Sequence, residues 1–289
     1  MGDRVIRAIT LDGSFRVITV RTTDLVRATT AIQEVSGQDA RVFGELLTGA
    51  ILVRETMSPA HRVQTILSRS ERGQMLADAH PDAGDTSGAL TRGLVNRLGN
   101  AAMSELLGEG AILKVIRSLP GGKLHQSIVE ASGTQMSQAL MVYMQESEQV
   151  VATLVVATTI DDEGRVVAAG GYIVQVLPEI QEGPLAVMTE RLAHDFPHID
   201  AFLLQHDADP RILKDELLYG MPHEDLFEGA LRSGCDCSEA RVLGAIATLG
   251  RDEVVQIIAQ GEVVSLTCEY CRKPWVITAE RLKNLLTPS

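Results

Sequence analysis

The sequence lacks an apolar run long enough to cross a membrane. A membrane-spanning helix needs roughly 18 consecutive apolar residues, and polar or charged residues interrupt every apolar stretch of the 289-residue chain before that length. The opening residues, MGDRVIRAIT, do not have the basic and then apolar form of a secretory signal. We therefore expect a soluble, cytoplasmic protein with no membrane partner.

The sequence contains fewer basic than acidic residues. The chain has 26 lysines and arginines against 38 aspartates and glutamates, and its formal net charge is −12 at pH 7. Contacts with nucleic-acid phosphates need a basic face, so this balance argues against a general nucleic-acid binder. The imbalance is local: residues 179–231 contain 3 basic and 12 acidic side chains, which is nine of the twelve excess negative charges.

Cysteine is scarce too, and all four cysteines lie beyond residue 234. Cys235 and Cys237 form a C-x-C pair, and after thirty intervening residues Cys268 and Cys271 form a C-x-x-C pair. In a reducing compartment, thiols paired this closely are metal ligands or redox groups before they are permanent disulfides. Two loops with two thiolates each supply the four soft ligands that tetrahedral zinc prefers. The pattern therefore predicts one zinc ion bound by these four cysteines.

The role of such a zinc ion stays open at this point. Most all-cysteine zinc sites are closed and structural, which would suit a constitutive interaction protein. Each pair is also close enough in sequence to form a local disulfide on oxidation. That reaction would expel the metal, and a small unit that depends on the metal would unfold. The same four cysteines are thus compatible with a structural zinc site or with a redox switch.

Two other classes of protein are disfavoured. A thiol oxidoreductase would place its first thiol at a helix N-terminus, whereas the extended stretch RKPWVI follows Cys271. A nucleic-acid-binding zinc ribbon would need a basic unit, and residues 232–289 carry 7 basic and 7 acidic side chains. We find no convincing nucleophile, general base or nucleotide-binding motif elsewhere, and we do not expect an enzyme.

The first part of the chain, residues 1–178, is expected to be a mixed α+β domain. The runs VIRAITL and FRVITVR flank Asp12-Gly13 and predict a β-hairpin. Helical spacing predicts helices within 24–35 and 39–56, and residues 91–108 suggest a mixture of turn and helix. The strongly β-forming run at 150–160 predicts a central strand. A second strand follows at 166–178, where Gly170-Gly171 indicates a bulge or a close backbone approach.

Two smaller parts complete the chain. From residue 179 to 231 the pattern is helical up to Gly229, with short, acidic helices that depend on tertiary packing for their stability. We expect this segment to be a metastable linker. Residues 232–289 combine short helices and strands around the cysteines, and a unit of this size usually needs a metal or disulfides to fold.

With the cysteines placed, the sequence resembles the 33 kDa chaperonin family of bacterial redox-regulated heat-shock holdases. The resemblance spans the whole chain. Its most specific mark is the C-x-C and C-x-x-C element of Cys235, Cys237, Cys268 and Cys271, supported by YMQESEQ at 143–149 and GGYIVQVLP at 170–178.

This resemblance implies a chaperone that is switched by oxidation. In the reduced form the four thiolates hold one zinc ion and the protein is a poor chaperone. Oxidants such as hypochlorous acid, or peroxide with heat, would form the disulfides Cys235–Cys237 and Cys268–Cys271. Zinc then leaves, the C-terminal unit and the linker lose structure, and unfolding client proteins bind without ATP. Activated members of the family dimerise, so a homodimer is expected after oxidation.

Overall fold

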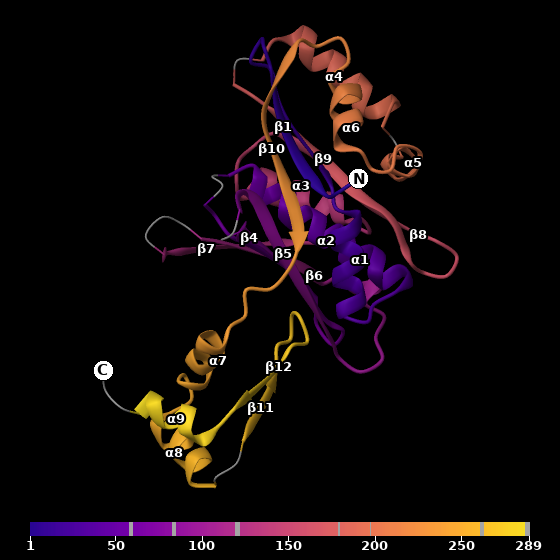
Figure 1. Ribbon diagram of the computed structural model, residues 1–289. Helices are drawn as coiled ribbons and strands as arrows, with labels where there is room; N and C mark the ends of the chain where they lie inside the picture. Colours follow the sequence, from indigo (N-terminus) through magenta and orange to yellow (C-terminus); the bar gives the residue numbers. More distant parts are fainter. Residues whose placement is uncertain are drawn as a thin grey trace. The chain divides into compact units, whose positions relative to one another are not determined.

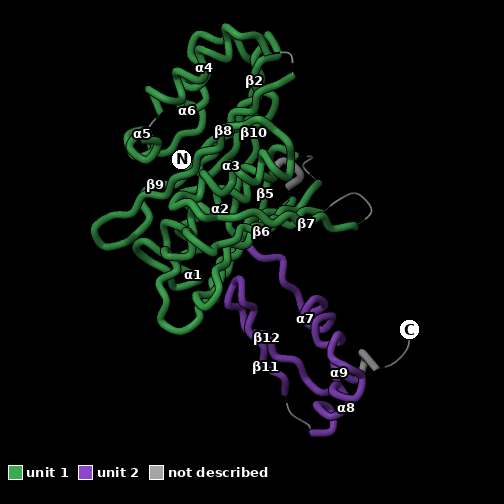
Figure 2. The backbone as a smooth tube through the Cα atoms, turned by 180° about the vertical axis from the view of Figure 1, so that it is seen from behind, with its two compact units in different colours: residues 1–233 green, residues 234–289 purple. Residues whose placement is uncertain are grey.

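A computed structural model describes residues 1–57, 60–82, 85–118, 122–178, 180–196, 198–260 and 263–286 (Figure 1). The chain forms two compact units, Met1–Ser233 and Gly234–Ser289, which Figure 2 distinguishes by colour. Both units contain helices and strands, so the expected α+β class is confirmed. Within the described part of the chain, no helix is long and apolar enough to cross a membrane.

The first unit is built on a ten-stranded sheet whose order is β7-β6-β3-β4-β5-β10-β1-β2-β9-β8. β10 pairs with β1 in the antiparallel sense and, over only three residues, with β5 in the parallel sense. It thereby joins the N-terminal hairpin of β1 and β2 to the strands of the middle of the chain. The strands are β1 (Arg4–Thr10), β2 (Phe15–Arg21), β3 (Val63–Arg69), β4 (Gly73–Asp82), β5 (Asp85–Arg97), β6 (Ala111–Ser118), β7 (Leu124–Glu130), β8 (Ala152–Ile160), β9 (Val166–Val176) and β10 (His223–Ser233).

The predicted N-terminal hairpin is confirmed, and the predicted helices follow it. β1 and β2 pair in register from Arg4 opposite Arg21, and the turn closes through Gly13, whose φ of 73° is a conformation that suits glycine. The helices of this unit are α1 (Thr23–Ile32), α2 (Gly37–Glu55), a 3₁₀ turn η1 (Met103–Leu106), α3 (Met136–Glu146), α4 (Glu182–His194), α5 (Ile199–Gln205) and α6 (Pro210–Leu217).

The main core lies between the sheet and the long helix α2. α2 contacts β3, β4, β8 and β9, and most of its side chains are buried, including Phe43, Leu46, Leu47 and Ile51. This explains why the helix is apolar around most of its circumference rather than along one stripe. α1 and α3 extend the same layer.

A second, smaller core lies under the helices of the segment that was expected to be a linker. α4, α5 and α6 gather against the part of the sheet formed by β1, β2, β8 and β9 (Figure 1). Phe15 and Val17 of β2 and Tyr172 and Val174 of β9 meet apolar side chains of these helices. In the described structure residues 180–231 therefore belong to the same compact unit as the sheet.

Three local predictions were wrong. The run at 150–160 forms β8, which lies at the end of the strand order rather than in the centre. Within residues 91–108, residues 91–97 continue strand β5 instead of forming turn and helix. The helical structure of this stretch is confined to η1. The segment from His223 to Gly229 is part of strand β10 and not helical, because its pairing with β1 overrides local helical preference.

The glycine pair in β9 does mark a close backbone approach, as predicted. A Cβ atom on Gly170 would lie 2.6 Å from the carbonyl oxygen of Val20, and one on Gly171 would lie 2.4 Å from that of Val155. The register of the β8–β9 ladder shifts elsewhere, between Thr159 and Ile160. The two glycines thus let β2 and β8 approach β9 closely on either side.

Candidate metal centre

The four cysteines lie in the second unit, on two short loops. Cys235 and Cys237 belong to the extended segment between β10 and α7 (Glu239–Ile246). Cys268 and Cys271 lie in the turn that joins β11 (Val264–Thr267) to β12 (Pro274–Ile277). The remaining helices of this unit are α8 (Arg251–Gln260) and α9 (Ala279–Leu286).

The β11–β12 turn holds its two cysteines in a defined geometry. The two strands pair in the antiparallel sense from Val264 opposite Ile277 to Thr267 opposite Pro274. Backbone hydrogen bonds then close the turn: the amide of Cys268 donates to the carbonyl of Lys273 over 2.9 Å, and the amide of Arg272 donates to the carbonyl of Cys268 over 2.8 Å. Arg272 takes a left-handed φ of 58°, which reverses the chain. Both thiols are therefore presented by one rigid hairpin.

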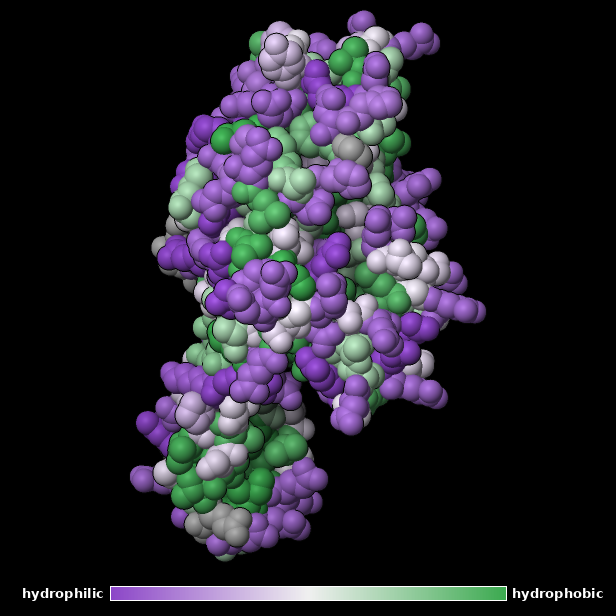
Figure 3. Space-filling model, turned by 90° about the vertical axis from the view of Figure 1, so that its right-hand side faces the viewer, coloured by the Kyte–Doolittle hydropathy of each residue, from purple (hydrophilic) through white to green (hydrophobic). Residues whose placement is uncertain are grey.

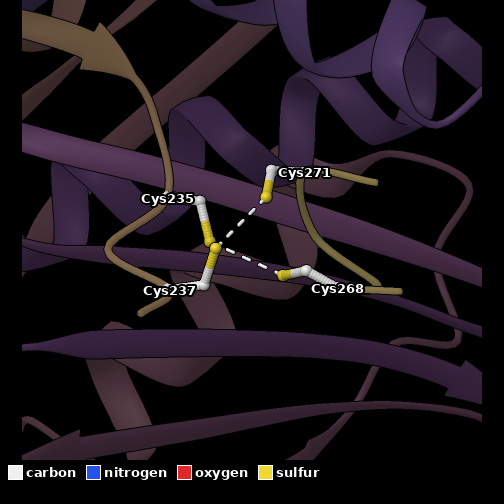
Figure 4. Close-up of side chains that lie close together, drawn as sticks. All are labelled: Cys235, Cys237, Cys268 and Cys271. Carbon is white, nitrogen blue, oxygen red and sulfur yellow. Dashed lines mark hydrogen bonds between the residues drawn. The ribbon is translucent and has the colours of Figure 1, made fainter. Parts of the chain in front are cut away.

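The four sulfur atoms converge on one point (Figure 4). All four Sγ atoms lie within 4.8 Å of one another, and all four residues are half-buried. The Sγ atoms of Cys235 and Cys268 are 3.8 Å apart, and those of Cys237 and Cys271 are 3.5 Å apart. A tetrahedral zinc ion with zinc–sulfur bonds of ~2.3 Å needs sulfur–sulfur separations of ~3.8 Å. The donor atoms and their spacing fit such an ion.

The sulfur separations are those of free thiols and not of disulfides. A disulfide bond is ~2.05 Å long, and the cysteines are free thiols. The two shortest contacts each join one cysteine of the C-x-C pair to one of the C-x-x-C pair. The loops are therefore held in the arrangement that suits shared coordination of a metal.

The two thiols of the C-x-x-C turn differ in acidity. Burial acts to raise the pKa of Cys268, but hydrogen bonds donated by the backbone amides of Cys271 and Tyr270 outweigh it and lower that pKa below its usual value. Burial raises the pKa of Cys271 to about 12, and the neighbouring thiols Cys237 and Cys268 add to the rise. Four thiolates cannot share so small a space without a compensating positive charge, which a divalent metal would supply.

Little else holds the second unit together. In the part that the structure describes, its apolar core has four buried side chains, with partly buried apolar residues packed against them. The four are Ile246, Val254, Ile277 and Leu282. Large apolar side chains remain on its surface, among them Val255 and Val276, and Figure 3 shows hydrophobic groups over much of one face of this unit. A unit with so small a core depends on an additional constraint such as a metal.

The apolar sheet face beneath α4–α6 is the second feature of functional interest. The covering helices contribute Met188, Leu203, Leu213 and Leu217, all of them almost completely buried. Removal of these helices would leave a continuous apolar surface on β2 and β9. Sequence reasoning identified the helices but not the residues they cover. The alternation of FRVITVR and the apolar stretch AAGGYIVQV were the only signals of that face.

Comparison with known proteins places the chain in a family. The family model described as Hsp33 protein matches residues 3–278. The chain belongs to the Hsp33 family. Curated Hsp33 relatives include the 33 kDa chaperonin of Syntrophotalea carbinolica, 28% identical over 99% of this chain and 100% of that protein. Another is the 33 kDa chaperonin of Microcystis aeruginosa, 30% identical over 99% of this chain and 97% of that protein.

The fold agrees with that of a solved Hsp33 structure. The crystal structure of the 33 kDa chaperonin of Thermotoga maritima superposes with a TM-score of 0.78 and covers 99% of this chain and 98% of that chain. Its sequence is 23% identical, so this likeness concerns the fold. The expected family is thus confirmed, and with it a chaperone that binds client proteins.

Proposed function

We propose that this Hsp33 protein is an ATP-independent holdase that oxidation activates. In this proposal residues 1–178 form the chaperone domain, residues 179–231 a metastable linker, and residues 232–289 the redox switch. The reduced form is a poor chaperone, and the oxidised form binds unfolding proteins and prevents their aggregation under oxidative and heat stress. The observation that carries the proposal is the convergence of all four cysteines within 4.8 Å of one another.

The metal in this proposal is one zinc ion. Cys235, Cys237, Cys268 and Cys271 are its ligands, because four sulfur atoms within 4.8 Å of one another, with two contacts of 3.5 and 3.8 Å, match tetrahedral zinc. When bound, zinc supplies positive charge that keeps the four thiols ionised, and the ion links the two loops. A structural zinc site of this kind contributes on the order of 10 kcal/mol to the folding of a small unit. That is comparable to the whole stability of an ordinary domain, ~5 to 15 kcal/mol.

Oxidation removes these ligands in two steps at each pair. A thiolate attacks the oxidant, peroxide or hypochlorous acid, and becomes a sulfenic acid. The neighbouring thiol then attacks that sulfur, a disulfide forms, and water leaves. In forming each disulfide, the two thiols together lose two electrons to one oxidant molecule. We assign the bonds to Cys235–Cys237 and Cys268–Cys271, since partners two and three residues apart meet most readily once the loops separate.

Loss of the metal is coupled to exposure of apolar surface. With its four-residue core, the second unit does not stay folded once the thiols are oxidised. β10 ends at Ser233, two residues before Cys235, so the linker and the switch are continuous in the chain. The linker helices are short and acidic, and their release would uncover the apolar face of β2 and β9. That face is the surface offered to clients.

The remaining features of the proposal concern partners and location. Unfolding client proteins are the partners, with no nucleic acid and no membrane, and the oxidised protein acts as a homodimer in the cytoplasm. A catalytic thiol oxidoreductase is the weaker alternative, because strand β12, and not a helix, follows Cys271. A constitutive interaction protein with a structural zinc is the other alternative.

One experiment separates these possibilities. The reduced protein is treated with peroxide at elevated temperature while a chromogenic chelator reports zinc release and light scattering reports the aggregation of a heat-unfolding client. We expect release of one zinc per chain and suppressed aggregation together. Zinc release without suppressed aggregation would favour the interaction protein, and catalytic turnover of a dithiol substrate would favour the oxidoreductase. A Cys268→Ser and Cys271→Ser double variant lacks two of the proposed ligands, so it should hold no zinc before oxidation and show no oxidant-dependent zinc release.

A further inference from the structure

The turn between α5 and α6 has an unusual backbone. Asp207 and Ala208 are consecutive residues with φ angles of 50° and 54°, in the left-handed region that residues other than glycine disfavour. Ala208 is fully buried, and its amide donates to the carbonyl of Leu203 over 2.7 Å. The amide of Asp209 also donates to the carbonyl of His206 over 3.0 Å. Beyond these internal bonds, two consecutive left-handed residues other than glycine need stabilisation by neighbouring groups.

Two polar side chains of β2 supply that support. The Thr19 hydroxyl donates to the carbonyl of Pro210 over 2.7 Å, and the Arg21 Nε–H donates to the carbonyl of Asp207 over 3.1 Å. Thr19 and Arg21 are two residues apart and therefore lie on the same face of the strand as Phe15 and Val17. On that face of β2 the first two side chains are apolar and the last two are polar. The polar side chains hydrogen-bond to the backbone of the turn.

The contacts that position the Arg21 side chain come mainly from outside the linker, from Asp3 before β1 and from Asp24 on α1, while the linker adds the 3.4 Å contact between Arg21 Nη2 and Asp207 Oδ1. The Arg21 Nη1 group bonds to Asp3 Oδ1 over 2.6 Å and to Asp24 Oδ2 over 2.8 Å, and the Arg21 side chain is only 4% exposed. Asp3 in turn accepts the backbone amide of Leu25 at the start of α1 over 2.6 Å. The guanidinium keeps its position when the linker leaves, whereas the turn loses its support.

We propose that Thr19 and Arg21 form a latch that holds the α5–α6 turn in its left-handed conformation and sets how readily the linker detaches. On the proposed function, on which this inference rests, the latch sets the dose of oxidant needed for activation. In the detached state Asp207 and Ala208 can relax to ordinary backbone angles, which favours detachment. The hydrogen bonds from Thr19 and Arg21 exist only while the linker is attached, so they favour the attached state. Changes to the two sides of the latch must therefore have opposite effects.

Two substitutions test the latch in the reduced, metal-loaded full chain. Thr19→Val keeps the shape and the strand preference of the side chain and removes only the hydroxyl. Loss of one buried hydrogen bond should raise the opening constant of the α5–α6 segment roughly fivefold. Asp207→Gly relieves a left-handed position and also removes an ion pair between Asp207 Oδ1 and Arg21 Nη2, which is long at 3.4 Å and involves a side chain that is 67% exposed. Exposed pairs of this kind contribute little, so the relief of the backbone dominates and should lower that constant roughly threefold. Hydrogen–deuterium exchange of the amides in residues 199–217 measures both.

Matched controls come from parts of the chain that do not touch the linker. Thr23→Val removes a buried hydroxyl that donates to the carbonyl of Ala169 over 3.3 Å and accepts from the amide of Ala169 over 3.0 Å. Glu34→Gly relieves an exposed left-handed residue, with a φ of 53°, after α1. Neither control should alter exchange in residues 199–217. Equal exchange in Thr19→Val and the wild type, or faster exchange in Asp207→Gly, would overturn the latch.

A second readout separates the latch from the proposed function. Titration with peroxide should show that Thr19→Val suppresses client aggregation at a lower oxidant dose than the wild type, and that Asp207→Gly needs a higher dose. If exchange shifts in the predicted directions while the oxidant dose does not, the latch stands and the proposed function fails. If exchange does not shift, the latch fails whatever the chaperone assay shows.

Discussion

Leu203→Ala should turn the reduced, metal-loaded protein into a constitutive holdase. Leu203 lies on α5, is fully buried, and packs over Gly170 of β9: a Cβ atom on Gly170 would lie 3.2 Å from Leu203 Cδ2. Truncation of a buried leucine to alanine costs about 3 kcal/mol or more. If the linker opens separately from the sheet, this cost shifts its opening equilibrium roughly 100-fold.

The measurement is light scattering of a heat-unfolding client in the presence of a reductant, with zinc content checked throughout. Leu204→Ala is the matched control, since it makes the same change one residue later on the same helix at a side chain that is 51% exposed. We expect suppressed aggregation from Leu203→Ala and none from Leu204→Ala. Hydrogen exchange should show faster opening in α4–α6 and unchanged protection in β9. If Leu203→Ala loses protection in β9 and α5 together, the linker is not a separate unit and the reasoning is refuted.

Three further predictions follow from the metal site and from the core. Cys237→Ser should release zinc from the reduced protein and unfold residues 234–289, which atomic absorption and circular dichroism would detect; retention of stoichiometric zinc would contradict the assigned ligand set. Removal of zinc by a strong chelator under reducing conditions should suppress client aggregation without disulfides, and added zinc should reverse it; a chelated protein that stays inactive would show that disulfides are themselves required. Glu45 tests the pH dependence of stability. Burial, opposed by Arg41, raises the pKa of its carboxyl group from 4.5 to about 7 in the folded protein. As the pH rises, the unfolded chain loses this proton before the folded protein does, so the free energy of unfolding should fall by about 3 kcal/mol between pH 4.5 and pH 7. Glu45→Gln should flatten that part of the profile in denaturant unfolding, and an unchanged slope would count against a buried Glu45.

The features that were predictable from the sequence are local ones. The β1–β2 hairpin follows from two alternating β-branched runs around Asp12-Gly13, because a tight turn and its flanking strands are encoded within twenty residues. The convergence of the four cysteines could be expected for a related reason. Each pair occupies one short loop, and a single ion satisfies both loops.

The features that were missed depend on contacts between distant segments. β10 has an acidic sequence with a weak alternation of Phe227, Gly229 and Leu231, and it becomes a strand because β1, more than two hundred residues earlier, supplies its hydrogen-bonding partner. β8 has the most β-forming sequence but lies at the sheet end, where α2 and α3 cover its side chains. Burial by helices makes a strand as apolar as a central position would, so composition alone does not distinguish the two cases.

The contact between two polar side chains of β2 and the α5–α6 turn could not be predicted from the sequence, for a similar reason. Thr19 and Arg21 sit in an ordinary alternating strand, and nothing in that stretch indicates that the backbone of residues 207–210 lies against them. Their role depends on tertiary packing of the α5–α6 turn. Only the structure brings these segments together.

Metal-controlled release of the linker is tested most directly by hydrogen exchange across α4–α6 before and after full thiol oxidation, with zinc release followed in the same sample. We predict that oxidation frees one zinc per chain and removes the protection of amides in α4–α6, while amides in β9 keep theirs. Persistent protection of α4–α6 after complete zinc release would contradict the coupling between the cysteine site and the apolar face of the sheet.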